Sequence, residues 1–145
     1  MNTAPLPLTA TLERRVRFDE LDPMGIMWHG NYASWFEDGR EAIGQRCGTT
    51  YMDFYRNGVL TPIKTYTVDY RQPLRYGTLY TIRTDLMWTE AAKILYSYTI
   101  LTPENAVATT ASTTQLFTDT DGRLLLDPPA FYKEFLARWK RGEFR

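Results

Sequence analysis

Four long segments in the second half of the chain have the composition of β-strands, and they constrain the fold most. They are rich in β-branched and aromatic residues and run from Pro62 to Arg71, Leu79 to Trp88, Lys93 to Thr102 and Val107 to Thr118. Short stretches with the residue types of turns separate them, so consecutive segments can fold back on one another. We therefore predict an antiparallel meander of four strands.

A single long helix is predicted ahead of these strands, from Asn31 to about Arg46. Its apolar residues recur at spacings of three and four, and Gly48 is a natural C-cap. Gly39 and Gly44 each lower the helix propensity by about 1 kcal/mol, which close packing against a sheet would offset. A long sheet needs its concave face filled, and this helix is the obvious filler.

The remaining segments complete an α+β fold in one domain. The length of 145 residues suits a single domain, which we assign to residues 11–145 after a loose arm over residues 1–10. Alternating residue types from Thr11 to Asp19 predict a first strand. Tyr51 to Asn57 is expected to form a short helix, and Pro128-Pro129 opens an amphipathic C-terminal helix. Four or five strands leave a free sheet edge that a partner subunit can cover.

Charge and composition argue against several classes of protein. Seventeen basic and seventeen acidic residues balance, whereas a nucleic-acid-binding protein usually carries a basic field. With one histidine and one cysteine, a zinc site would need mostly carboxylates, so we predict no metal. No apolar run approaches roughly 18 residues, and the N-terminus lacks the apolar core of a signal peptide. We therefore expect a cytoplasmic protein without membrane or nucleic-acid partners.

The stretch from Asp19 to Arg40 carries the candidate chemistry. Asp22 lies in a turn seven residues before His29, just ahead of the predicted helix. A carboxylate in such a place can act as a general base on water or attack a carbonyl itself. The first helical turn has N–H groups without intrahelical partners and a positive dipole end, which would stabilise a developing oxyanion. Together these groups suffice for acyl transfer to water.

Each of these residues also has a purely structural interpretation. Asp22 can make a local Asx turn with backbone N–H groups. His29 is either a second base or ligand, or a capping and packing residue. Trp28 is expected to be wall or core, and Asp19 and Glu20 are expected to be solvated. Spacing alone does not choose between these alternatives.

The segment from Arg15 to Glu41 resembles the opening motif of the 4-hydroxybenzoyl-CoA thioesterase-like family of hotdog-fold acyl-CoA thioesterases. The family pattern is an aromatic-ended strand, D-x-D-x-x-G, a few apolar residues, H or Y, and then N-Y-x-x-W-F-E/D-x-x-R. Glu occupies the first acidic slot here. The pattern is filled by Phe18, Glu20, Asp22, Gly25, His29, Asn31, Tyr32, Trp35, Phe36, Glu37 and Arg40.

This resemblance implies a five- or six-stranded antiparallel sheet wrapped around the long helix. It also implies a homodimer with active sites at the subunit interface, often as a homotetramer of two dimers. Asp22 takes the catalytic position, and His29 polarises the thioester carbonyl through its backbone N–H. The expected reaction is hydrolysis of an acyl-CoA to the acid and CoA. It needs no metal or organic cofactor, since coenzyme A is part of the substrate.

Further positions carry over from the resemblance as binding residues. Glu37 either reaches the acyl pocket, where it would favour an acyl group with a polar end, or forms an ion pair with Arg40. The candidates for CoA phosphates, Lys93, Arg71 and Arg75, are alternatively solvated surface charges. The predicted substrate-binding residues are Gly25, Trp28, Asn31, Tyr32, Glu37 and Thr61.

Two other functions fit the same fold. An acyl-carrier-protein thioesterase is favoured by the small number of basic residues around the expected CoA site, where the turn before Lys93 has no other cation. A non-catalytic acyl-binding protein is the other alternative, because a fold does not fix a function. The identity of the acyl chain stays open.

Overall fold

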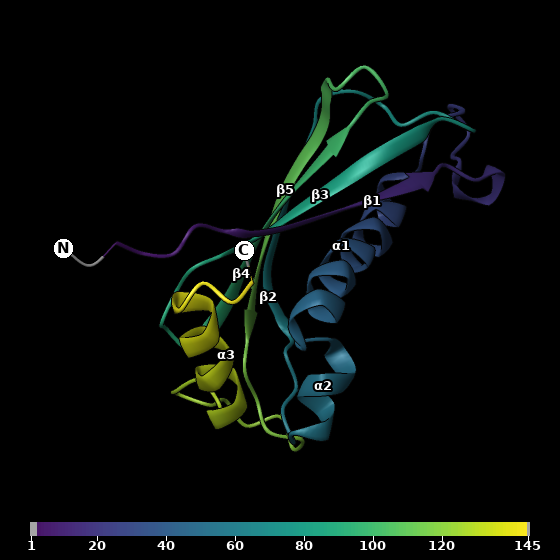
Figure 1. The fold of residues 1–145 in the computed structure, drawn as a ribbon. Coiled ribbons are helices and arrows are strands. Elements are labelled where there is room, and N and C mark those ends of the chain that lie inside the picture. Colours follow the sequence, from purple (N-terminus) through teal and green to yellow (C-terminus); the bar gives the residue numbers. More distant parts are fainter. Residues whose placement is uncertain (1–2, 145) are drawn as a thin grey trace.

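One five-stranded antiparallel sheet curves around a long helix (Figure 1). The computed structural model describes residues 3–144. The strand order is β1-β3-β4-β5-β2, and short 3-10 turns at Phe18–Glu20 and His29–Asn31 link the first strand to the helix. The elements are β1 (Leu8–Arg15), α1 (Tyr32–Cys47), α2 (Tyr51–Arg56), β2 (Ile63–Tyr70), β3 (Leu79–Met87), β4 (Lys93–Leu101), β5 (Val107–Leu116) and α3 (Ala130–Lys140).

The predicted four-strand meander is wrong for one strand. Strands β3, β4 and β5 follow one another, but β2 pairs with β5 at the far edge of the sheet. The place beside β3 belongs to β1, which pairs with it from Leu8 opposite Leu86 to Arg15 opposite Leu79. The connection from β2 to β3 therefore crosses the end of the sheet, where the Met27 N–H donates to the Leu74 carbonyl.

The first strand begins and ends earlier than predicted. It covers Leu8–Arg15 rather than Thr11 to Asp19, because β3 is long enough to pair with residues of the predicted arm. The arm also has a contact with the C-terminal helix: the Trp139 indole N–H donates to the Leu6 carbonyl at 3.1 Å. Met1 and Asn2, which the arm prediction includes, lie outside the described residues.

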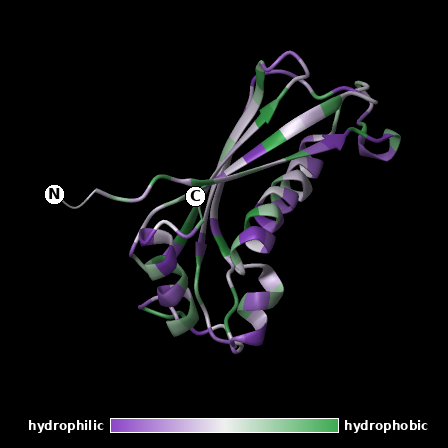
Figure 2. Cartoon of the chain, in the orientation of Figure 1, coloured by the Kyte–Doolittle hydropathy of each residue, from purple (hydrophilic) through white to green (hydrophobic). Residues whose placement is uncertain are grey.

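Helix α1 packs closely on the sheet, as its spacing predicted. Trp35, Phe36 and Ile43 are completely buried beneath it. Figure 2 shows hydrophobic and hydrophilic positions mixed along α1, which has a solvent-facing side as well as a packed one. A Cβ on Gly39 would lie 2.0 Å from the Thr84 hydroxyl of β3, so the predicted sheet packing explains this glycine. Gly44 has a different cause, since a Cβ there would meet the Thr50 backbone at 2.8 Å.

Replacing Gly39 by Ala is expected to destabilise the protein despite the better helix propensity. The added methyl forces overpacking against Thr84, which typically costs about 1–3 kcal/mol, against a gain of about 1 kcal/mol in the helix. Urea unfolding measures the difference. In a Thr84→Ala background the same substitution should cost less, because the clashing hydroxyl is gone. An equal cost in both backgrounds would show that this contact is not the cause.

Helix α2 is started by a capping box. The Thr50 hydroxyl accepts from the Asp53 N–H at 3.1 Å, and the Asp53 carboxylate accepts from the Thr50 N–H at 2.9 Å. Hydrogen bonds from the Thr50 side chain and backbone hold the pKa of Asp53 below its ordinary value. The box fixes where α2 begins, and with it the positions of Tyr51 and Phe54.

Thr50→Ala is expected to lower the unfolding free energy by about 1 kcal/mol at pH 7. The lowered pKa of Asp53 gives a stability contribution that is present above the unfolded pKa and is lost as pH falls through the folded one. The difference between wild type and Thr50→Ala should therefore shrink below about pH 4. Urea titrations at several pH values check this, and a difference that is constant from pH 7 to pH 3 would contradict it.

Strand β2 closes one side of the sheet and is almost entirely exposed. Ile63, Tyr66 and Tyr70 present apolar surface there, and the outer backbone edge of β2 has no strand beside it among the described residues. Such an edge can pair with another strand. None of the helices in residues 3–144 combines the length and apolar content needed to cross a bilayer.

Candidate active site

Asp22 sits at the start of a tight turn before α1. Its Oδ1 accepts hydrogen bonds from the Met24 N–H at 2.8 Å and the Ile26 N–H at 3.4 Å. The Asx-turn interpretation of the sequence is thus correct for this oxygen. Within residues 3–144, Oδ2 accepts no hydrogen bond, so the same turn that holds the carboxylate leaves one oxygen available for chemistry. The structural and catalytic interpretations of Asp22 are compatible.

Gly25 contributes its backbone conformation rather than a contact surface. Its φ of 78° lies in the left-handed region that favours glycine, and its N–H donates to the Asp22 carbonyl at 3.0 Å. The Asp22 N–H in turn donates to the Ile26 carbonyl at 2.9 Å. The chain is therefore reversed within five residues, which brings the helix start back beside the turn.

The residues between the turn and α1 present free amide groups. His29 and Gly30 open a 3-10 turn, and neither N–H donates to an acceptor in the described part of the chain. The Trp28 ring packs over Gly30 so closely that any Cβ there would lie 2.2 Å from it. The His29 imidazole is exposed and stacks at a tilt on Trp28, with ring centroids 5.1 Å apart. Free N–H donors and an apolar wall thus lie together.

Glu20, predicted to be solvated, is buried at 5% exposure. Its carboxylate accepts from the Arg14 guanidinium, the Arg17 N–H and the Trp35 indole N–H, each at 2.9 Å. The prediction failed because the three donors come from β1, the loop after it and α1, which only folding brings together. Its neighbour Asp19 is exposed and pairs with Arg17, as predicted for a solvated acid.

The Glu20 backbone also holds the segment from Trp28 to Asn31. Its carbonyl accepts from the Trp28 N–H at 2.9 Å and from the Asn31 side-chain amide at 2.8 Å. The side-chain amide of Asn31, which was predicted to bind substrate, therefore holds the turn in position. Tyr32, predicted to line the site, is buried and packs edge-on against Tyr70 of β2 at 4.8 Å.

The other predicted residues lie at two ends of the sheet. Arg75 is beside the Asp22 turn, since its backbone bridges to Ile26, and Arg71 follows β2 at the same end. Arg71 also pairs with Asp69 on the surface, at 3.1 Å. Lys93 begins β4 at the opposite end, roughly 26 Å along the strand from Leu101. A single chain therefore does not bring the three predicted CoA contacts together.

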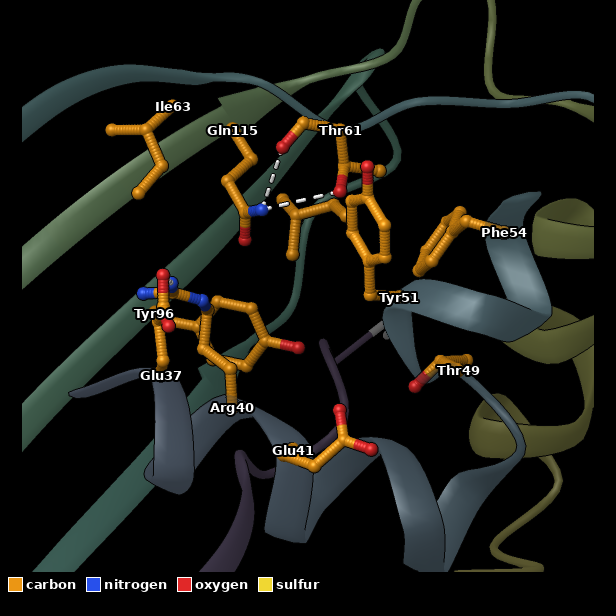
Figure 3. A pocket seen from close by; sticks show the side chains of 11 residues that line it. Glu37, Arg40, Glu41, Thr49, Tyr51, Phe54, Thr61, Ile63, Tyr96 and Gln115 are labelled. Atoms are coloured by element: carbon orange, nitrogen blue, oxygen red, sulfur yellow. Dashed lines mark hydrogen bonds and ion pairs between the residues drawn. The ribbon is translucent and has the colours of Figure 1, made fainter. Parts of the chain in front are cut away.

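A cavity of about 420 Å³ lies between the two helices and the sheet (Figure 3). Thr61 lines it, and both its carbonyl and its hydroxyl accept from the Gln115 amide, at 2.8 and 3.2 Å. Glu37 lines the same cavity, as one sequence interpretation expected. Its carboxylate also lies 3.9 Å from the Arg40 guanidinium, as the other interpretation expected. The cavity is lined by Glu37, Arg40, Glu41, Thr49, Tyr51, Phe54, Thr61, Ile63, Ile94, Tyr96 and Gln115.

Sequence reasoning missed most of this cavity. Thr49, Tyr51 and Phe54 come from the α1–α2 connection and α2, and Tyr96 comes from the middle of β4. In the sequence, Tyr96 belongs to an alternating strand pattern and looks like core. Burial raises the pKa of its hydroxyl, which therefore stays protonated. The spacing of Thr50 and Asp53, which is typical of a capping box, is a local signal that could have located the start of α2.

Comparison with known proteins extends the resemblance from the opening motif to most of the chain. Residues 16–139 match the sequence pattern described as the Thioesterase-like superfamily. YneP of Bacillus subtilis, named as a candidate acyl-CoA thioesterase, is 32% identical over 123 residues, covering 85% of this chain and 87% of its own. A DHNA-CoA thioesterase structure from Staphylococcus aureus has a TM-score of 0.79 at 26% identity, covering 92% of this chain and 95% of its own. The chloroplast acyl-acyl carrier protein thioesterase ATL3 of Arabidopsis thaliana is 28% identical over 89 residues, 61% of this chain and 47% of its own.

Proposed function

This chain belongs to the thioesterase-like superfamily and is a thioester hydrolase of the hotdog fold, and on that premise we propose that Asp22 hydrolyses an acyl-CoA at the start of α1. The observation that carries the proposal is the Asx turn. Within the described residues, it holds the Asp22 carboxylate by Oδ1 and leaves Oδ2 free, next to the His29 and Gly30 N–H groups, which donate to no acceptor there. Acyl transfer to water needs this combination of a base or nucleophile and oxyanion donors.

The proposed roles follow from the atoms that are available. Asp22 Oδ2 takes a proton from water or attacks the thioester carbon itself. The His29 N–H, with the Gly30 N–H beside it, donates to the carbonyl oxygen as negative charge develops there. The Trp28 ring is the wall beside these donors. Arg75 and Arg71, at the same end of the sheet, are the better placed cations for the CoA phosphates.

A second copy of the chain would complete the site. In a two-fold dimer paired through β2, the two β2 strands run antiparallel, so Tyr70 of one copy lies opposite Ile63 of the other. Tyr70 contacts Tyr32 at the helix start, whereas Ile63 lines the cavity with Thr61. Such pairing would bring the Asp22 turn of one copy toward Thr61 and Glu37 of the other. The same antiparallel pairing would bring Lys93 of one copy toward the Asp22 turn of the other.

The experiment that tests the function is thiol release from a panel of acyl-CoAs that differ in chain length, branching and aromaticity. We expect release from at least one class, with turnover that depends on the acyl group. Sedimentation equilibrium on the same protein should give a dimer or a dimer of dimers. Absence of release from every CoA ester would contradict CoA as the thiol carrier.

An acyl-carrier-protein thioesterase is the second candidate. One observation favours it: Arg71, a predicted contact for the CoA phosphates at the same end as the Asp22 turn, is already paired with Asp69 at 3.1 Å. The similarity to ATL3, an acyl-acyl carrier protein thioesterase, also favours this candidate. Presenting one acyl group on CoA and on acyl carrier protein separates the two, because the preferred carrier should give the higher kcat/KM.

A further inference from the structure

Strand β1 places one charged side chain among the apolar ones that face α1. Leu12 and Val16 pack against the hydrophobic core, and Arg14 lies between them in the same alternation. Strand β1 and helix α1 pack against each other there (Figure 1). The Arg14 side chain is only 20% exposed, and an arginine in such a place is costly unless it is paired. An apolar residue would fit the strand pattern equally well, so packing alone does not explain Arg14.

The Arg14 guanidinium connects α1 to the turn after β1. Its Nη1 donates to the Ser34 hydroxyl at 3.1 Å and to the Asp38 carboxylate at 2.8 Å, one helical turn apart on α1. Its Nη2 donates to the Glu20 carboxylate at 2.9 Å. The guanidinium also lies over the Trp35 ring, 4.9 Å from the ring centroid. The planar arginine fork offers several donors in fixed directions, so it holds Glu20 at one place on the helix.

Glu20 in turn holds both ends of the segment with the free N–H groups. Its carbonyl accepts from the Trp28 N–H at 2.9 Å and from the Asn31 side-chain amide at 2.8 Å. The two residues between these anchors are the proposed oxyanion donors. Asp22 follows Glu20 by only two residues. The position of Glu20 therefore sets where the Asp22 carboxylate and the N–H donors lie relative to each other.

We propose that Arg14 is a positioning residue of the thioesterase reaction. By holding Glu20 against α1, it fixes the distance from the Asp22 carboxylate to the N–H groups of His29 and Gly30. The inference rests on the proposed function for the roles of those groups. Misplacing reacting groups by about 1 Å can cost about 10²-fold in rate, so loss of this contact should lower kcat rather than raise KM.

The first test removes the helix contacts of Arg14 and leaves Arg14 and Glu20 in place. The anchor variant, Ser34→Ala with Asp38→Ala, loses both acceptors on α1. Both residues are exposed and alanine is the best helix former, so the urea unfolding midpoint should stay close to wild type. We expect kcat for thiol release to fall about three- to tenfold with KM unchanged. A kcat equal to that of wild type overturns the proposal.

Arg14→Met keeps the apolar stem and removes every donor. We expect kcat to fall about 10- to 100-fold, again with little change in KM. Adding Ser34→Ala and Asp38→Ala to Arg14→Met should cause no further loss, because the two acceptors affect the site only by holding Arg14. A further loss as large as that in the wild-type background would contradict the proposal. The matched control is Arg83→Met, which removes an arginine of β3 with an ion pair to Asp85 and should keep kcat.

Amide hydrogen exchange gives a readout that does not depend on catalysis. The Trp28 N–H donates to the Glu20 carbonyl, so its exchange rate reports whether this contact holds. In the anchor variant we expect faster exchange at Trp28 and no change in β4 and β5. Unchanged exchange at Trp28 overturns the positioning role even if CoA esters are hydrolysed. Faster exchange confined to this segment supports the role of Arg14 even if no CoA ester is hydrolysed, a result that would count against the proposed function alone.

Discussion

Asp22→Asn is expected to lower kcat for thioester hydrolysis by about 10²–10⁴, the usual contribution of a positioned base, with a small change in KM. The asparagine oxygen can still accept from the Met24 and Ile26 N–H groups, so the turn should persist and the unfolding free energy should change little. The free Oδ2 becomes an amide nitrogen that neither takes a proton nor attacks a carbonyl. Steady-state thiol release and urea unfolding on the same preparation measure both effects.

The matched control is Asp19→Asn, three residues earlier. It makes the same change of charge at an exposed carboxylate whose ion pair with Arg17 is also exposed. Exposed pairs contribute little, so activity and stability should both stay close to wild type. Equal activity of Asp22→Asn and wild type would remove Asp22 from the mechanism.

Oxygen labelling distinguishes the two roles of Asp22. A single turnover in H₂¹⁸O places the label in the released acid if the carboxylate acts as a general base. If it acts as a nucleophile and displaces the CoA thiolate, an acyl-aspartyl anhydride forms, and attack of water on its aspartyl carbonyl places label in the Asp22 carboxylate, which general-base catalysis never does. Mass spectrometry of the peptide that contains Asp22 reads the difference.

Glu20→Gln is expected to cost about 3–5 kcal/mol of unfolding free energy, the largest stability loss among these variants. The change leaves the partly buried Arg14 guanidinium without its 2.9 Å ion pair, and the new amide NH₂ faces donors rather than acceptors. Because the same residue holds Trp28 and Asn31 through its carbonyl, kcat should fall as well. Urea unfolding and thiol release measure the two losses.

The control for Glu20→Gln is Glu104→Gln, in the exposed turn between β4 and β5. This surface change should leave the unfolding free energy within about 0.5 kcal/mol of wild type. A Glu20→Gln protein as stable as this control would mean that Arg14 finds sufficient compensation in Asp38, its other partner at 2.8 Å.

Glu20 and Asp19 illustrate how much of the structure can be predicted from the sequence. They are adjacent acids in one local pattern, and the same interpretation was given to both. It was right for Asp19 and wrong for Glu20, because burial depends on donors that are distant in sequence. Trp35 is fifteen residues from Glu20, yet it supplies one of the three hydrogen bonds to its carboxylate.

The sequence by itself determined the element types, the long helix with its glycine packed on the sheet, and the turn with Asp22 ahead of the helix start. These features follow from local periodicity, turn chemistry and a motif confined to one stretch of chain. Only the tertiary structure decided that β2 lies at the sheet edge, that Glu20 is a buried anchor, and that Arg40, Thr49 and Tyr96 share a cavity. Each of these features depends on which segments, distant in sequence, pack together in the fold. The composition of one segment does not specify which segments pack against it.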